Sequence, residues 1–205
     1  MSSTRFSKLV VLINALIPLA LLLFDVARNN VGPNPQEFAL RTTGMLTLVF
    51  LTLTIAITPL RKTFSANSLV KLRRMVGLFA FFYGCLHLLA YLWLDRVFDF
   101  LSVGQDVVRR PFILIGMTAF FLMVPLAITS TNNMVKRLGG KRWALLHKLV
   151  YVAAIGGVLH FWMLVKSDTR LPLTFAFIVG VLLLHRLLVK YVPQGTPQTS
   201  LFPKD

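Results

Sequence analysis

Long runs of apolar residues divide the chain into six segments that are separated by short polar stretches. The runs cover residues 9–27, 42–60, 75–94, 112–130, 146–165 and 171–190. An α-helix needs roughly 17–25 mostly apolar residues, at about 1.5 Å of rise each, to cross the hydrocarbon core of a bilayer. The runs lack the alternation of a β-strand and are too long for strands. The pattern therefore predicts an all-α, integral membrane bundle of six transmembrane helices.

The same pattern indicates a single membrane domain. We expect residues 1–191 to form the six-helix domain, and the polar residues 192–205 to be a disordered tail. Arg5 and Lys8 precede the first apolar run, as in a signal peptide, but no small-residue cleavage motif follows that run. The first run is therefore interpreted as an uncleaved span.

Composition agrees with a membrane protein. Hydrophobic residues make up 56% of the 205 residues and charged residues only 14%, whereas a soluble domain usually carries about a quarter charged residues. The chain has one cysteine, Cys85, which excludes a disulfide framework and a cysteine-based zinc or iron–sulfur site.

The net charge of +15 arises from 22 Lys and Arg against 7 Asp and Glu. In a soluble protein this excess would suggest a nucleic-acid partner. With the N-terminus placed in the cytoplasm, however, 15 of the 22 basic residues fall on the cytoplasmic side and 7 on the opposite side. Basic residues favour the cytoplasmic side of spans. The charge thus predicts that both termini are cytoplasmic, and it needs no nucleic acid to explain it. The 7 on the opposite side are Arg28, Arg41, Arg96, Arg109, Arg110, Lys166 and Arg170.

Two histidines are predicted to lie at the same depth on different spans. His87 is about 12 residues, or roughly 18 Å, above the inner edge of the third span. His160 is about 14 residues, or roughly 21 Å, above the inner edge of the fifth. Ionisable side chains inside a span are costly and usually functional. Two imidazoles at matched depth are the axial ligands that one haem iron requires.

Glycines accompany both histidines. Gly84 precedes His87 by three residues, and Gly156 and Gly157 precede His160 by four and three. Residues at these spacings share a helix face, so a flat porphyrin could lie against them. The alternative is that small residues only allow the helices to pack closely.

A third histidine lies lower in the fifth span. His147 precedes His160 by 13 residues, which places it roughly 20 Å nearer the cytoplasm. At the corresponding distance below His87 the third span carries Arg73 and Arg74 instead of a histidine. His147 could therefore ligate a second haem, contact a flavin or quinone, or be an interfacial residue. The two arginines could hold a flavin phosphate or haem propionates, although positive-inside topology alone explains them.

These residues lie in blocks that resemble the MsrQ (YedZ) family, a branch of the ferric-reductase-like transmembrane group. The resemblance covers residues 40–190. The last of its blocks is the most specific, because it joins TST, LG-KRW, LH-LVY and LHFW at the family's spacing. The blocks are ITPLRK (57–62), RRMVGLFAFFYGCLHLLAY (73–91), RRPFILIGM (109–117) and AITSTNNMVKRLGGKRWALLHKLVYVAAIGGVLHFW (127–162).

The resemblance implies a function. The family supplies the haem-binding subunit of a periplasmic methionine sulfoxide reductase system in the bacterial inner membrane. Its members take electrons from a cytoplasmic flavin reductase or from quinol. They pass these electrons through b-type haem to MsrP, a periplasmic molybdopterin enzyme that repairs oxidised envelope proteins. The family is also described as binding FMN.

On this resemblance the chain is expected to be a multi-pass, non-catalytic electron-transfer subunit. The family's histidine ligands correspond to His87, His147 and His160, so one haem b is expected and a second is left open. His185 falls outside the family pattern. We expect the partner to dock on the loop 95–111 and the turn 166–170.

The competing interpretation is a non-redox membrane protein, such as a small transporter or an assembly factor, in which the histidines are structural. A transporter is expected to show paired repeats and broken helices around a midplane site. The sequence displays neither feature.

Overall fold

The computed structural model describes residues 3–65 and 67–191, and every regular element in that part of the chain is a helix. Six segments of it are long and apolar enough to cross a membrane, which confirms the expected all-α bundle. They comprise α1 (Ser3–Ala27), α2 (Pro35–Phe64), α3 (Val70–Ala90), α5 (Pro111–Ile128), α7 (Gly140–Leu146) continued by α8 (Leu149–Leu164), and α9 (Arg170–Tyr191). The tail 192–205 lies outside the described residues.

Shorter helices lie between the spans. α4 (Phe100–Arg109) occupies the segment that the sequence analysis treated as a loop. The Asp99 side chain starts this helix by accepting hydrogen bonds from the backbone N–H groups of Leu101 and Ser102. The remaining pieces are a 3₁₀ turn (Asn67–Leu69), a π-helical turn (Tyr91–Asp95) and α6 (Asn132–Leu138).

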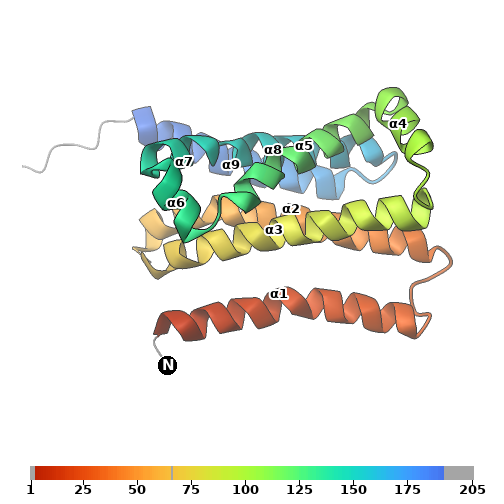
Figure 1. The fold of residues 1–205 in the computed structure, drawn as a ribbon, viewed down its shortest axis with the longest axis horizontal. Helices are drawn as coiled ribbons and strands as arrows, with labels where there is room; N and C mark the ends of the chain where they lie inside the picture. Colours follow the sequence, from red (N-terminus) through yellow and green to blue (C-terminus); the bar gives the residue numbers. More distant parts are fainter. Residues whose placement is uncertain (1–2, 66, 192–205) are drawn as a thin grey trace, which may run out of the picture.

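The spans run side by side, so that α1 begins and α9 ends at the same end of the bundle (Figure 1). We call this the basic end; it includes residue 65 and the segments 67–69 and 129–148. The opposite end, which includes the segments 28–34, 96–110 and 165–169, is called the far end. In Figure 1, α1 lies along one side, next to α2 and α3, and α5, α8 and α9 lie on the other side of that pair.

The core is built around α2. Its residues Leu48, Leu51 and Ile55 pack against α3, α5, α8 and α9. Ala80, Ala153 and Ala154 are completely buried in this core, and such small side chains let membrane helices approach closely. Large apolar side chains cover the outside instead, as a bilayer requires; examples are Leu23, Phe121 and Phe177, which are 60%, 61% and 73% exposed.

A buried carboxylate organises the far end. Asp106 on α4 pairs with the guanidinium groups of Arg96 and Arg110 and accepts a hydrogen bond of 2.8 Å from the hydroxyl of Tyr91. Between Arg96 and α4 the backbone of residues 97–98 has φ angles of +49° and +59°. These angles are strained for residues other than glycine. The ion pairs of Asp106 therefore hold a strained turn between α3 and α4.

We expect Asp106→Ala to lower the free energy of unfolding by at least about 2 kcal/mol, because partly buried arginines lose their carboxylate. The melting temperature of the detergent-solubilised protein measures this loss. Asp95→Asn is the control: Asp95 also contacts Arg96, at 3.3 Å, but its side chain is 41% exposed, so its loss should cost less than about 1 kcal/mol. Equal melting temperatures for both variants would contradict this role of Asp106.

Candidate functional site

The structure brings His87 and His160 together, as their matched depth predicts. His87 lies near the end of α3 and His160 near the end of α8, both toward the far end. Their ring centroids are 6.2 Å apart, and the ring planes are at 80° to each other. Both rings are half-buried. Two histidines that are 73 positions apart in sequence therefore face each other within the bundle.

Each of the two rings is held by a backbone carbonyl at its Nδ1 atom. His87 Nδ1 lies 3.0 Å from the carbonyl oxygen of Leu40 on α2. His160 Nδ1 lies 2.6 Å from that of Phe112 on α5. A carbonyl oxygen can only accept, so each Nδ1 carries the proton. Each Nε2 is thereby left as a free electron-pair donor, the arrangement typical of metal-ligating histidines.

This geometry fits two axial ligands of one haem iron. Metal–imidazole bonds of about 2 Å on either side of a shared ion place the ring centroids roughly 6 Å apart. The observed separation is 6.2 Å. Among the described residues no group of three His, Cys, Asp or Glu side chains could hold a metal ion by itself. Two histidines alone match iron whose other ligands come from a macrocycle.

The three glycines singled out beside these histidines contact neighbouring helices. A Cβ atom on Gly84 would stand 3.1 Å from the Met123 side chain, and one on Gly156 would stand 3.1 Å from the Ala119 side chain. A Cβ on Gly157 would stand 3.3 Å from Leu48. In this structure the three positions thus lie in close contacts between helices, as the packing alternative expects. The glycines that touch the imidazoles are on the facing helices, at positions 44 and 116.

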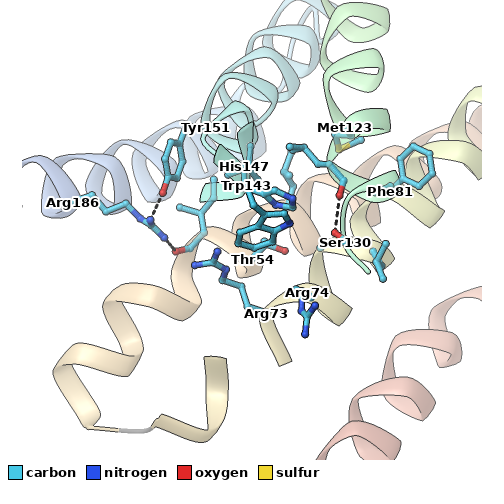
Figure 2. Close-up of a pocket in the computed structure, with 17 residues that line it drawn as sticks. Thr54, Arg73, Arg74, Phe81, Met123, Ser130, Trp143, His147, Tyr151 and Arg186 are labelled. Carbon is cyan, nitrogen blue, oxygen red and sulfur yellow. Dashed lines mark hydrogen bonds between the residues drawn. The ribbon is translucent and has the colours of Figure 1, made fainter. Parts of the chain in front are cut away.

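A second group of polar residues lines a cavity at the basic end (Figure 2). Arg73 and Arg74 reach it from α3, and Arg186 reaches it from α9. The Arg186 guanidinium donates to the Tyr151 hydroxyl and, at 2.7 Å, to the Ile55 carbonyl oxygen. Arg186 was not identified from the sequence, because a basic residue near the inner end of a span is already explained by topology.

His147 lies in the same cavity, at the junction of α7 and α8. Its ring stacks on Trp143 with centroids 3.9 Å apart, and its Nε2 is 3.1 Å from the Thr129 hydroxyl. That hydroxyl also lies 2.6 Å from the carbonyl oxygen of Pro125, its shortest contact; with the proton directed to this carbonyl, the hydroxyl accepts a hydrogen bond from His147 Nε2–H. His147 therefore differs from the other two histidines, whose Nε2 atoms are free.

The cavity is basic without a matching acid. None of the described residues that line it is Asp or Glu, whereas three are arginines. His185 does not line it; its Nδ1 is buried and has no hydrogen-bond partner among the described residues. Clustered guanidinium groups bind phosphates and carboxylates through strong charge-assisted hydrogen bonds. The cavity is therefore suited to an anionic group.

The two sites are separated along α3. Phe81, which lines the cavity, and His87 are six residues apart, or roughly 9 Å along the helix. Phe81 also stacks on Phe120 of α5, with centroids 5.6 Å apart. One stacked aromatic pair on α3 and α5 thus lies at the side of the basic cavity toward the paired histidines.

Comparison with known proteins agrees with this arrangement. Residues 40–158 match the family model of the ferric reductase like transmembrane component. The chain is 53% identical to the protein-methionine-sulfoxide reductase heme-binding subunit MsrQ of Herminiimonas arsenicoxydans, over 88% of this chain and 84% of that protein. It is 47% identical to the protein of the same name in Rhodospirillum rubrum, over 90% and 88%, and 45% identical to that of Ralstonia nicotianae, over 97% and 92%. With such similarity over most of its length, the chain belongs to the MsrQ family of ferric-reductase-like membrane components.

Proposed function

We propose that the chain carries electrons across the bacterial inner membrane on a single b-type haem held by His87 and His160. The observation that supports this most strongly is the facing pair of imidazoles, each with Nδ1 bound to a carbonyl and Nε2 free. The bound haem would supply one-electron reduction and oxidation at its iron. The protein contributes ligand orientation and an apolar surrounding.

The number of haems is proposed to be one because His147 is arranged for another role. Its Nε2 is hydrogen-bonded to the Thr129 hydroxyl at 3.1 Å, and α3 presents Arg73 and Arg74 where a second axial ligand would be needed. We propose that electrons enter the protein at this cavity, which would bind an anionic flavin such as FMN. The arginines would bind its phosphate, and the stacked rings of Trp143 and His147 would form one wall. A cytoplasmic flavin reductase or quinol would be the upstream donor.

The direction of transfer follows from the distribution of charge. The basic end carries most of the Lys and Arg residues, so we propose that it is the cytoplasmic end. The paired histidines lie toward the far end, which would face the periplasm. We infer that electrons leave there for the partner reductase, the molybdopterin enzyme MsrP, and so support repair of oxidised methionine in envelope proteins.

This function is tested by following the haem after chemical reduction. Protein reduced in membranes without oxygen should remain almost fully reduced when a trace of MsrP alone is added, because MsrP without substrate takes up only a few electrons per molecule. It should reoxidise within seconds to minutes when methionine sulfoxide is also supplied, because that substrate withdraws electrons through the partner. A haem that stays reduced with both present would contradict the proposal.

Docking of the partner at the far end can be tested by charge reversal. We expect Arg109→Glu to slow reoxidation by the partner several-fold at low salt, with the haem spectrum unchanged, because exposed charges steer association. Arg109 is exposed on α4, whereas Arg110 is unsuitable because it pairs with Asp106 at 3.2 Å. Arg28→Glu, on the α1–α2 connection at the same end, is the control. Equal rates for the two variants would contradict docking on this loop.

A further inference from the structure

Two glycines outside the histidine-bearing helices form the surface against which the imidazoles lie. A Cβ atom on Gly44 of α2 would stand 3.0 Å from His87 Cε1 and 3.1 Å from its Nδ1. A Cβ atom on Gly116 of α5 would stand 2.6 Å from His160 Nδ1 and 2.9 Å from its Cε1. Carbon atoms make favourable contacts only from about 3.5 Å. Any side chain at either position would therefore displace the ring.

Each glycine lies four residues after the carbonyl that accepts the ring proton. His87 Nδ1 is bound to the carbonyl of Leu40 and covered by Gly44; His160 Nδ1 is bound to that of Phe112 and covered by Gly116. In an α-helix the carbonyl of residue i points along the axis toward the N–H of residue i+4. A side chain at i+4 would crowd the approach of a second donor to that carbonyl. A glycine leaves the approach open.

We infer that Gly44 and Gly116 are positioning residues: each opens a helix carbonyl to the Nδ1–H of one histidine and thereby fixes the orientation of that imidazole and its strength as an iron ligand. This inference rests on the proposed role of the two histidines in haem binding. The same arrangement of a carbonyl followed four residues later by a glycine occurs on α2 and on α5. The loss of such an outer hydrogen-bond partner typically weakens metal binding by about 10-fold to 100-fold.

The other glycines provide matched controls within the membrane. A Cβ on Gly84 would be almost as crowded as one on Gly44, at 3.1 Å, but by the Met123 side chain. A Cβ on Gly180 of α9 would meet nothing within 4 Å. Gly84→Ala therefore introduces a packing clash without contact to an imidazole, and Gly180→Ala introduces neither.

The test compares Gly116→Ala and Gly44→Ala with these two controls in the full-length protein. Three quantities are measured: the haem-to-protein ratio, the electron paramagnetic resonance spectrum of the ferric haem, and its midpoint potential. Loss of the hydrogen bond from Nδ1–H to the carbonyl oxygen makes the imidazole a weaker electron donor to the iron. The ferric form of the haem would then be less stabilised. We expect altered resonance positions and a more positive midpoint potential. The change should be larger for Gly116→Ala, whose added carbon is closer to the ring, than for Gly44→Ala.

Gly84→Ala should lower the melting temperature without moving the resonance positions or the potential, and Gly180→Ala should change none of these. If Gly116→Ala loses haem entirely, the milder Gly44→Ala decides the question. Wild-type resonance and potential in Gly44→Ala, or an equal spectral change in Gly84→Ala, would overturn the positioning role while leaving the haem assignment intact. A wild-type protein without any b-type signal would instead refute the proposed function.

Discussion

Replacing either His87 or His160 by alanine is expected to abolish the low-spin b-type haem signal. Each ring is held by a hydrogen bond from its Nδ1–H to a backbone carbonyl oxygen, and the two ring centroids are 6.2 Å apart. On the proposed assignment, removal of one ring would leave the haem iron with one imidazole ligand instead of two. The haem-to-protein ratio should fall several-fold, and any haem that remains should be high-spin. Absorbance spectra of the purified variants measure both quantities.

The remaining two histidines serve as controls for this prediction. His147→Ala should retain the haem, because His147 lies at the opposite end of α8 and its Nε2 is bound to Thr129. The His147→Ala variant should differ from the wild type only in the rate at which the donor reduces the haem. His185→Ala should have little spectral effect, since that side chain lies outside the cavity. Normal low-spin haem in both the His87→Ala and His160→Ala proteins would remove the ligand assignment.

The double variant Arg73→Gln/Arg74→Gln is expected to weaken FMN binding by at least about tenfold. Each hydrogen bond between a charged group and its partner contributes roughly 1.5–3 kcal/mol, and about 1.4 kcal/mol corresponds to a tenfold change in affinity. Both side chains line the basic cavity, and neither approaches the paired histidines. Titration of FMN fluorescence measures the affinity, and the haem-to-protein ratio should stay at the wild-type value.

The control for this variant is Lys141→Gln/Arg142→Gln. This control also removes two positive charges from the basic end. Lys141 and Arg142, however, are exposed on α7 and do not line the cavity. Arg186→Gln adds a second test, because its guanidinium enters the cavity from a different helix. If the control weakens FMN binding as much as the cavity variant does, the effect is general electrostatics, and the flavin site lies elsewhere.

The spans could be predicted from sequence because the bilayer imposes a length and an apolar composition on them. The run 171–190 corresponds to the observed helix Arg170–Tyr191, and the run 112–130 to Pro111–Ile128. α4 was not predicted, because it has only 10 residues and a mixed composition. Asp99 at its start was the available signal, since Asp favours the position before a helix.

The facing histidines could be predicted because depth along a helix is a simple function of residue number. Their supporting groups could not. Gly44 and Gly116 lie on helices that carry no histidine, so only the packing of α2 against α3 and of α5 against α8 shows which residues touch the rings. Likewise, only the packing shows that the nearest neighbours of Gly84, which shares a face with His87, are Met123 and Phe120 of α5. The protonation of His147 likewise depends on Thr129, 18 positions away.

The most direct test of the proposed electron carrier is the reduced-minus-oxidised absorbance spectrum of the purified wild-type protein, combined with its haem and iron content per chain. We expect a low-spin b-type spectrum with one haem per chain, because among the described residues His87 and His160 form the one close pair of histidines, each with its Nδ1 on a carbonyl oxygen. Two haems per chain would contradict the role assigned to His147. The absence of a b-type signal would contradict the electron-transfer function itself.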